Sequence, residues 1–301
     1  MKIEFKKRKE IEVEKWDRLV AESPAETIYP YSWYLDVVAE NWSALVVEDY
    51  RFVMPVVWKK KAGIKYIYQP FYTQQLGVFS REYVDPELIR KLLRILYKKF
   101  RFAGINFNSK NLIGEEAPFI VDDKSNYVLT LDQDYDTHSG LYSSNARRNI
   151  KKSMELSEHI EKNLPVGELL RLKRENDVIK RSEEEYGWML ELFETLLERK
   201  AGKIYAIRSG SDVNAAAFFA FSKNRAIYLL SASSQTGKEE RGMFRIVDAF
   251  IKDFAGSGLI LDFEGSNIPS VARFFGGFGA RAEIYQGVSF SRLPAPLAKL
   301  R

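Results

Sequence analysis

A carboxylate at the end of an apolar stretch is the best candidate for acid–base chemistry in this sequence. The stretch 259–263 reads as a short strand, and Glu264 follows it directly. Strand alternation puts Asp262 and Glu264 on the same side of that strand. A carboxylate in this place could accept a proton from an attacking amine. Glu264 could instead cap the helix predicted to begin at Pro269, or pair with an arginine.

Two polar stretches have side chains suited to holding a substrate. The first follows the third predicted strand of the chain, and it combines hydrogen-bonding groups with apolar bodies in Tyr72, Thr73, Gln74 and Gln75. The second is the pair Ser266 and Asn267, just after Glu264. Tyr285, on the predicted last strand, is a second catalytic candidate, because its hydroxyl could donate to a leaving group. It could equally pack in the core.

Four cations are grouped on one predicted helix, 141–156. Arg147 and Lys151 are four residues apart, as are Arg148 and Lys152, so the helix has two adjacent basic rows. Ile150 and Met154 are expected to form its apolar row. Arginine forks and lysine ammonium groups suit phosphate oxygens, so these cations are predicted to bind donor phosphates. The alternative is an exposed basic face with no ligand.

The elements that would position these residues occur in the same order twice. Each half reads as three strands, a helix and a further strand, and the strand before such a helix usually lies parallel to the strand after it. The first copy is predicted as strands 44–47, 52–58 and 64–68, helix 86–102 and strand 105–107. The second is predicted as strands 204–207, 215–221 and 226–231, helix 243–254 and strand 259–263.

This repetition predicts an α/β fold with mixed sheets, built from two tandem copies of one unit. The first domain is expected to span 1–124 and the second 125–301, with a helical insertion at about 141–200. Low residue identity between the copies leaves open a second interpretation, in which they are two unrelated α+β segments.

Composition excludes several classes of site. The chain of 301 residues has no cysteine and only two histidines, so we expect no disulfide, no thiol nucleophile and no metal site. The amino terminus lacks the apolar core of a signal peptide, and no apolar run approaches the ~18 residues of a membrane helix. We therefore expect a cytoplasmic protein without a membrane span. Its net charge of +5 is only mildly basic.

Three stretches, in this order, resemble the FemAB-like branch of the GNAT acyltransferase superfamily. They are 142–152 (YSSNARRNIKK), 260–266 (ILDFEGS) and 271–279 (VARFFGGFG). The resemblance implies two tandem GNAT-like domains and the transfer of an acyl or aminoacyl group to an amine. The implied donor is aminoacyl-tRNA, as in the peptidoglycan enzymes of the branch, or acyl-coenzyme A, as in ordinary GNAT enzymes.

The sequence departs from the usual GNAT pyrophosphate turn, Gln/Arg-x-x-Gly-x-Gly/Ala. Gly242 takes the place of its glycine, but Glu239 stands where Gln or Arg is expected and Phe244 where a small residue is expected. An acid and a bulky ring oppose phosphate binding electrostatically and sterically. Arg241 and Gly242 are the donor-phosphate candidates of this turn. The charged stretch 164–185 is short compared with the tRNA-binding arm of the peptidoglycan enzymes.

These observations predict an acyltransferase that acts on a small-molecule or peptide amine, held in a groove between the two domains, with tRNA as a further partner if it carries the acyl group. An alternative is a non-catalytic ligand-binding protein of the GNAT fold. A third interpretation, nucleic-acid binding through the basic helix, is weaker, because no aromatic residues are interleaved with its basic rows.

Overall fold

The computed structural model describes residues 1–114, 116–156, 159–265 and 268–293. The chain divides into two compact units. The first unit comprises Met1–Ser125 together with Glu283–Arg301, and the second comprises Asn126–Ala282. Of the described residues, 283–293 thus group with the first unit, whereas the predicted second domain included them.

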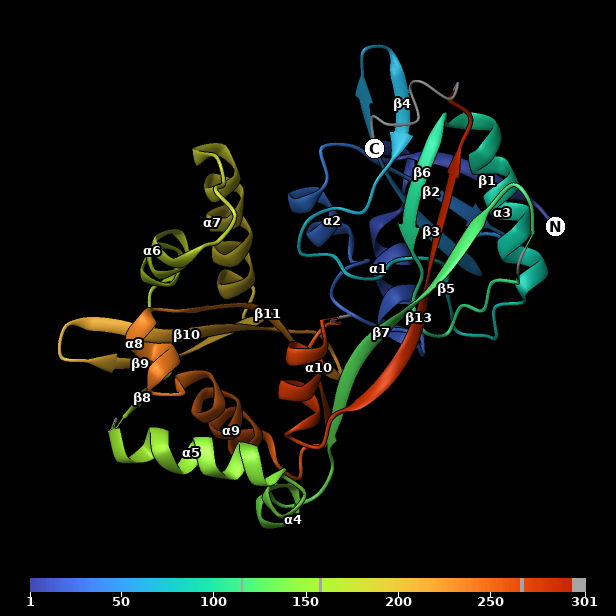
Figure 1. The fold of residues 1–301 in the computed structure, drawn as a ribbon. Helices are drawn as coiled ribbons and strands as arrows, with labels where there is room; N and C mark the ends of the chain where they lie inside the picture. Colours follow the sequence, from blue (N-terminus) through green and yellow to red (C-terminus); the bar gives the residue numbers. More distant parts are fainter. Residues whose placement is uncertain (115, 157–158, 266–267, 294–301) are drawn as a thin grey trace. The chain divides into compact units, whose positions relative to one another are not determined.

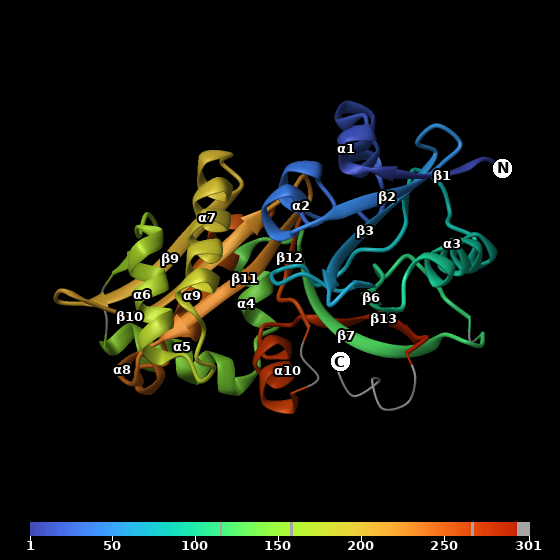
Figure 2. The same cartoon turned by 90° about the horizontal axis from the view of Figure 1, so that it is seen from above.

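The first unit is a mostly antiparallel sheet with helices on both faces. Its elements are β1 (Ile3–Lys7), the short 3-10 helix η1 (Arg8–Glu10), α1 (Val13–Glu22), α2 (Ser32–Val38), β2 (Trp42–Val47), β3 (Phe52–Lys61), β4 (Ile64–Ile67), β5 (Phe79–Ser80), α3 (Pro86–Lys99) and β6 (Phe102–Asn106). The strand order is β1-β2-β3-β4-β6-β13, and β5 pairs with β3. Figure 2 shows α3 on one side of strands β1–β3 and α1 on the other.

Helix α3 begins and packs as its sequence predicts. The Asp85 side chain accepts a hydrogen bond from the Glu87 amide, and Pro86 occupies the first turn, where no amide hydrogen is needed. Its buried face consists of Leu88, Ile89, Leu92, Leu93 and Leu96, which join the core beneath β2, β3 and β6. The strands on either side of α3, β4 and β6, pair in parallel, which confirms the predicted crossover.

The second unit has its sheet in the order β7-β12-β11-β10-β9-β8. Its elements are β7 (Ile120–Leu131), α4 (Tyr135–Gly140), α5 (Ser144–Leu156), β8 (Ile160–Glu161), α6 (Val166–Asn176), α7 (Glu183–Glu198), β9 (Gly202–Ser209), β10 (Asp212–Phe221), β11 (Arg225–Ser233), α8 (Gln235–Glu239), α9 (Gly242–Phe254), β12 (Leu259–Asp262) and α10 (Pro269–Gly276); β13 (Arg281–Ser291) follows. β11 and β12, on either side of α9, pair in parallel, so the second predicted crossover is also confirmed.

The two units repeat one element order, as predicted. The series β1-α1-α2-β2-β3-β4-α3-β6 matches β8-α6-α7-β9-β10-β11-α9-β12. Because α6 and α7 correspond to α1 and α2 and pack on β9, β10 and β11, they are part of the repeat and not of an insertion. In the predicted insertion 141–200, only the helical segment before β8 has no counterpart in the first unit.

The helices of the second unit form two layers around the sheet. Figure 1 shows α6 and α7 on one face, and α5 and α9 on the other. Alternation along β10 supplies both cores. Ala215, Ala217 and Phe219 pack in the α9 core, where the Phe219 and Phe250 rings stack at 3.9 Å. Phe218 lies on the opposite side of β10, and the centre of its ring is 4.7 Å from the centre of the Phe193 ring in α7.

Strands β7 and β13 each contain residues of both units. The last residues of β7 pair with β12 in the second unit, and the last residues of β13 pair with β6 in the first. At 12 and 11 residues, both strands are about twice the usual length. This length explains why the predicted boundary near residue 125 falls inside a strand.

Two glycines are expected to respond oppositely to alanine. A Cβ at Gly237 in α8 would lie 2.0 Å from the Asn214 carbonyl oxygen, whereas a Cβ at Gly187 in α7 would meet no atom within 4 Å. We expect Gly237→Ala to lower the free energy of unfolding by about 2 kcal/mol or more, and Gly187→Ala to raise it by up to about 1 kcal/mol. Urea denaturation of both variants checks this. Equal effects would contradict the close approach of α8 to β10.

Candidate active site

A cavity of about 380 Å³ lies in the second unit, where β11 leaves β12. β12 pairs only with Arg225, Ala226 and Ile227, although β11 continues to Ser233. Residues 228–233 therefore have no partner strand on that side within the described part of the chain. The cavity opens along this edge, and Tyr228, Ser231 and Ser233 line it together with the start of α9 and part of α10. The end of a parallel strand next to a helix amino terminus is a common ligand site in α/β folds.

Two bulges shape the strands beside this cavity. The pairing of β10 with β11 shifts between Phe218 and Phe219, which leaves Leu229 as an extra residue in β11. The pairing of β10 with β9 shifts around Asn214. Bulges leave the extra residue outside the regular ladder and bend the strand. Burial raises the pKa of Tyr228, next to the first bulge, to about 12, so its hydroxyl stays protonated at neutral pH.

The turn between β11 and α9 is held against β10 by close packing. The Asn214 carbonyl oxygen accepts from the Ser234 amide at 2.9 Å, and the Asn214 side chain donates to Glu240 at 3.2 Å. Gly237 contacts Asn214, and a Cβ at Gly242 would lie 2.8 Å from the Ala215 Cβ. The predicted phosphate glycine Gly242 therefore has a packing role, because a larger residue would push the start of α9 off the sheet.

The amino end of α9 presents positive charge to the cavity. Arg241 is its N-cap in the left-handed conformation (φ 61°), makes no side-chain capping bond in the described structure, and lines the cavity with Lys238. Backbone N–H groups at a helix amino terminus attract anions. Of these two cations, Arg241 was predicted from the sequence and Lys238 was not. Its position three residues earlier in the same turn was the available signal.

The two departures from the pyrophosphate turn have different outcomes. Glu239 accepts a hydrogen bond from Gln235 at 2.8 Å on exposed α8 and is not part of the cavity lining. The negative charge of Glu239, which was expected to oppose phosphate binding, is therefore not part of the cavity wall. Phe244 does line the cavity, and its ring packs edge-to-face on Phe274 of α10 at 4.8 Å. The cavity therefore has an aromatic wall at the position where a small residue was expected.

Glu264 has an unusual backbone conformation. Eight non-glycine residues among those described have positive φ, and seven of them lie in turns. Glu264 (φ 56°) is the eighth, and it lies outside any turn, just after β12. The left-handed conformation costs a non-glycine residue about 1–2 kcal/mol. Such outliers occur often at functional sites, where surrounding structure maintains them.

The Asp262 side chain holds the Glu264 backbone through a hydrogen bond. Its Oδ1 accepts from the Glu264 amide at 2.8 Å, and its Oδ2 accepts from Arg225 Nη1 at 2.5 Å. Asp262 is 1% exposed. Asp262 and Glu264 were predicted to lie on one side of the strand. Asp262 is buried and bonds to Arg225, whereas Glu264 is half-buried. Arg225 lies 37 residues away in the chain, and no local pattern in the sequence indicates this pairing.

The predicted substrate loop of the first unit is pinned to β6. Asn106 donates to the Gln74 carbonyl oxygen at 3.0 Å, and Gln69 donates to the Thr73 carbonyl oxygen at 2.7 Å. Thr73 and Gln75 are only 3% and 4% exposed, so their side chains are buried and are not presented to a substrate. Tyr72 and Gln74 are half-buried and can still contact a ligand. Tyr72 has φ 55°, and its carbonyl oxygen accepts from the Tyr34 hydroxyl.

A second cavity, of about 620 Å³, lies within the first unit, and its lining includes Gln69 and Asn106, which donate hydrogen bonds to this loop. Its floor is the open face of β4 and β6, where the Tyr66 and Phe102 rings stack at 4.5 Å. Its polar end carries Asn106 and Lys124, joined by a hydrogen bond of 2.8 Å. Burial raises the pKa of Tyr68, on the same wall, to about 12. This cavity suits a ligand with an apolar body and a polar end.

The four cations of the predicted basic helix lie on α5, separate from the α9 cavity lining. Arg147, Arg148, Lys151 and Lys152 are all exposed, and within the described ranges none forms an ion pair. The buried face of α5 is Ala146, Ile150 and Ser153. Met154, predicted to join Ile150, is 60% exposed, because the buried row advances by four residues and then three. The predicted donor-phosphate residues therefore form two groups.

The remaining candidates divide between the units. Tyr285 lies in β13, among the residues of the first unit, with 7% of its surface exposed. Ser266 and Asn267 lie outside the described residues. Over the described residues, no three His, Asp or Glu side chains are placed to hold a metal ion. None of the described helices combines the length and apolar character needed to cross a membrane.

A buried acid on α9 offers a test of pH dependence. Asp248 is 8% exposed and accepts from the Tyr135 hydroxyl at 2.9 Å. Burial raises the pKa of Asp248, and the Tyr135 hydrogen bond offsets this only in part. The unfolded chain therefore releases this proton at lower pH than the folded chain, and stability falls as pH rises from about 3.9 through the folded pKa.

We expect Asp248→Asn to raise the melting temperature at pH 7, because asparagine removes the buried charge and keeps an acceptor for Tyr135. The difference from wild type should shrink as pH falls through the folded pKa of Asp248 toward about 4. Calorimetric melting between pH 3 and 8 measures both. Asp253→Asn, on the same helix, serves as a control, and a destabilised Asp248→Asn at pH 7 would contradict the expectation.

No protein-family model matches this sequence, and no curated protein matches it. Solved structures do share its fold. The crystal structure of FemX is 13% identical, with 100% of this chain and 99% of that chain covered and a TM-score of 0.66. A tandem GNAT protein from the clavulanic acid biosynthesis pathway is 11% identical, with 98% and 100% covered and a TM-score of 0.60. L-PGS from Bacillus licheniformis is 12% identical, with 95% and 94% covered and a TM-score of 0.54. The predicted tandem GNAT-like fold is confirmed.

Proposed function

We propose that this chain, which has the tandem GNAT fold seen in FemX, is an N-acyltransferase. It transfers an acetyl or aminoacyl group from a phosphate-bearing donor to the amine of a small molecule or peptide. The donor is acyl-coenzyme A or aminoacyl-tRNA. The observation that carries the proposal is the cavity at the amino end of α9, beside the unpaired edge of β11 and lined by Lys238 and Arg241.

This cavity has the parts that a donor site requires. The cations and the helix amino end favour phosphate oxygens. The free edge of β11 offers backbone groups to the acyl portion, and the bulge at Leu229 makes this residue our candidate for stabilising the tetrahedral oxyanion through its backbone. Phe244 supplies an apolar wall.

Glu264 is our candidate for the base. The amine nitrogen attacks the acyl carbonyl carbon, and the carboxylate accepts the proton that the amine loses. The tetrahedral intermediate then collapses and expels the coenzyme A thiolate or the ribose oxygen of tRNA, which takes up a proton. The left-handed conformation of Glu264 and its support by Asp262 favour a functional role for this carboxylate.

Donor binding tests the proposal. The purified chain is titrated calorimetrically with acetyl-coenzyme A, aminoacyl-tRNA and deacylated tRNA. Micromolar binding of acetyl-coenzyme A supports a GNAT enzyme with an adapted phosphate turn, and tighter binding of aminoacyl-tRNA than of the other two supports an aminoacyl transferase. If none of the three binds, the proposal fails.

Charge reversal at the two cationic groups separates their roles. We expect Lys238→Glu/Arg241→Glu to weaken donor binding by at least about tenfold, because each cation loses a charge-assisted hydrogen bond to phosphate. Arg148→Glu/Lys152→Glu on α5 makes the same change of charge. It should weaken tRNA binding in a salt-dependent way and leave acetyl-coenzyme A binding within about twofold. Unchanged binding in both double variants at low salt would exclude both groups.

A non-catalytic ligand-binding module is the second candidate. Phe244 favours it, because a ring lines the donor cavity where GNAT phosphate turns have a small residue. Under this alternative a ligand binds but no acyl group is transferred. Mass spectrometry of donor–amine mixtures after incubation with the chain distinguishes the two, because only an enzyme forms an acylated amine.

A further inference from the structure

The largest cavity described in the first unit has a strongly cationic lining. Its volume is about 960 Å³, within the range of roughly 300–1,000 Å³ typical of small-molecule sites. Five cations line it: Lys7, Arg8, Lys9, Lys65 and Lys99. With two carboxylates, Asp36 and Glu40, the lining has a formal charge of +3.

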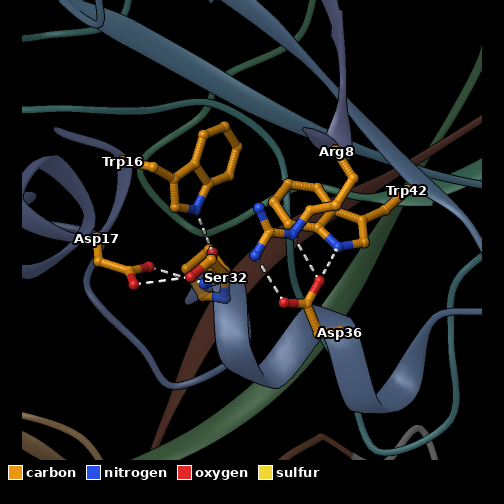
Figure 3. A network of polar contacts seen from close by, with 7 residues as sticks. Arg8, Trp16, Asp17, Ser32, Asp36 and Trp42 are labelled. Carbon is orange, nitrogen blue, oxygen red and sulfur yellow. Dashed lines mark hydrogen bonds and ion pairs between the residues drawn. The ribbon is translucent and has the colours of Figure 1, made fainter. Parts of the chain in front are cut away.

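Both carboxylates are already engaged. Arg8 donates to Asp36 through two bonds of 2.7 Å, and Trp42 Nε1 donates to the same carboxylate at 2.8 Å (Figure 3). The Glu40 carboxylate lies 3.6 Å from the Lys59 ammonium group. The other four lining cations form no ion pair with any residue that the structure describes. All four are exposed, and since like charges repel, an anion bound among them would lower that repulsion.

Aromatic rings hold the cations at the cavity wall. The Lys65 ammonium lies 5.0 Å from the centre of the Trp58 ring, and the Lys99 ammonium lies 4.6 Å from the centre of the Phe5 ring. All four of these residues line the cavity. The Phe5 and Trp58 rings are half-buried, and the ring surface they leave beside ammonium groups suits a ligand that has both a flat ring and anionic oxygens.

The wall that carries Trp42 is braced by a hydrogen-bond network. The Asp17 carboxylate accepts from the Ser32 amide at 2.8 Å and from its hydroxyl at 2.7 Å, at the start of α2 (Figure 3). Trp16 Nε1 donates to the Pro30 carbonyl oxygen at 2.7 Å. These bonds fix α2, which carries Asp36. The side of the cavity formed by α2 is therefore fixed before any ligand binds, which lowers the entropic cost of binding.

We propose that this cavity binds a small molecule with two or more phosphate groups attached to a planar ring, such as a nucleoside diphosphate. The phosphates lie among Lys7, Lys9, Lys65 and Lys99 and lower the repulsion between them. The ring packs against Trp58, the half-buried indole of the cavity lining. This inference does not rest on the proposed acyl transfer, because the residues of the α9 cavity take no part in it.

Calorimetric titration of the full chain with ADP, inorganic pyrophosphate and adenosine tests the ligand class. We expect ADP to bind most tightly, pyrophosphate more weakly because it lacks the ring, and adenosine not measurably. If neither ADP nor pyrophosphate binds, or if adenosine binds as tightly as ADP, the proposal is overturned. Binding of tRNA without binding of ADP would also overturn it.

A neighbouring lysine supplies a matched control for the site. Lys99→Glu should weaken ADP binding at least about tenfold, since it replaces a charge-assisted hydrogen bond by repulsion. Lys98→Glu changes the net charge equally on the same helix but lies outside the lining, and it should change affinity less than about twofold. Lys65→Glu provides a second loss at the other wall. Equal effects of the Lys98 and Lys99 variants, with melting temperatures unchanged, would show non-specific attraction and overturn the proposal.

Discussion

Replacing Glu264 by glutamine should lower the rate of acyl transfer by about 10²–10⁴-fold, the usual contribution of a general base. Glutamine keeps the size of the side chain and its hydrogen-bonding capacity, but it cannot accept the amine proton. Donor binding should stay within about twofold, because the cations of the donor cavity are unchanged. The rate is measured as acylated amine formed by the donor that the calorimetry identifies.

Glu239→Gln is the matched control for this substitution. It neutralises an exposed carboxylate on α8 that bonds to Gln235, so its rate should equal that of the wild type. Melting temperatures of both variants show whether the chain remains folded. A Glu264→Gln variant with full activity would exclude Glu264 as the base.

Removing Arg225 should lower the free energy of unfolding by about 3–5 kcal/mol, the usual cost of leaving a buried charge without its partner. The Arg225 and Asp262 side chains are 13% and 2% exposed, so water cannot replace the lost partner. Arg225→Ala should also disturb Glu264, whose amide donates to the same carboxylate. Urea denaturation measures the first effect, and the acyl-transfer rate measures the second.

Two further variants make this prediction specific. Arg225→Met/Asp262→Asn removes both charges and keeps an acceptor for the Glu264 amide, so it should recover most of the lost stability. Arg171→Ala breaks an exposed pair with Glu168, at 3.8 Å, and should change stability by less than about 0.5 kcal/mol. If Arg225→Ala is as mild as Arg171→Ala, the buried pair does not contribute as its burial implies.

The direction of side chains in the loops of the site could not be predicted from the sequence. Thr73 and Gln75 have the chemistry of substrate-binding residues, yet both are buried. Gln75 accepts from the Ser109 amide at 3.2 Å, a partner 34 residues away. Similarly, Glu239 and Lys238 are adjacent in the chain, but only Lys238 lines the donor cavity. No periodicity exists in such short turns to predict which side chain faces the site.

The order of the elements could be predicted from the sequence, as three strands, a helix and a strand that occur twice. The parallel pairing at both crossovers and the position of the α5 cations on one exposed face could be predicted as well. These features depend on apolar spacing over three or four residues, which a single sequence displays directly. Only the tertiary structure decided that Asp262 serves Arg225 while Glu264 takes a left-handed backbone, and that α6 and α7 belong to the repeat. It also decided that the last strand joins the first unit's sheet. These outcomes depend on contacts between residues far apart in the chain, for which no local pattern exists.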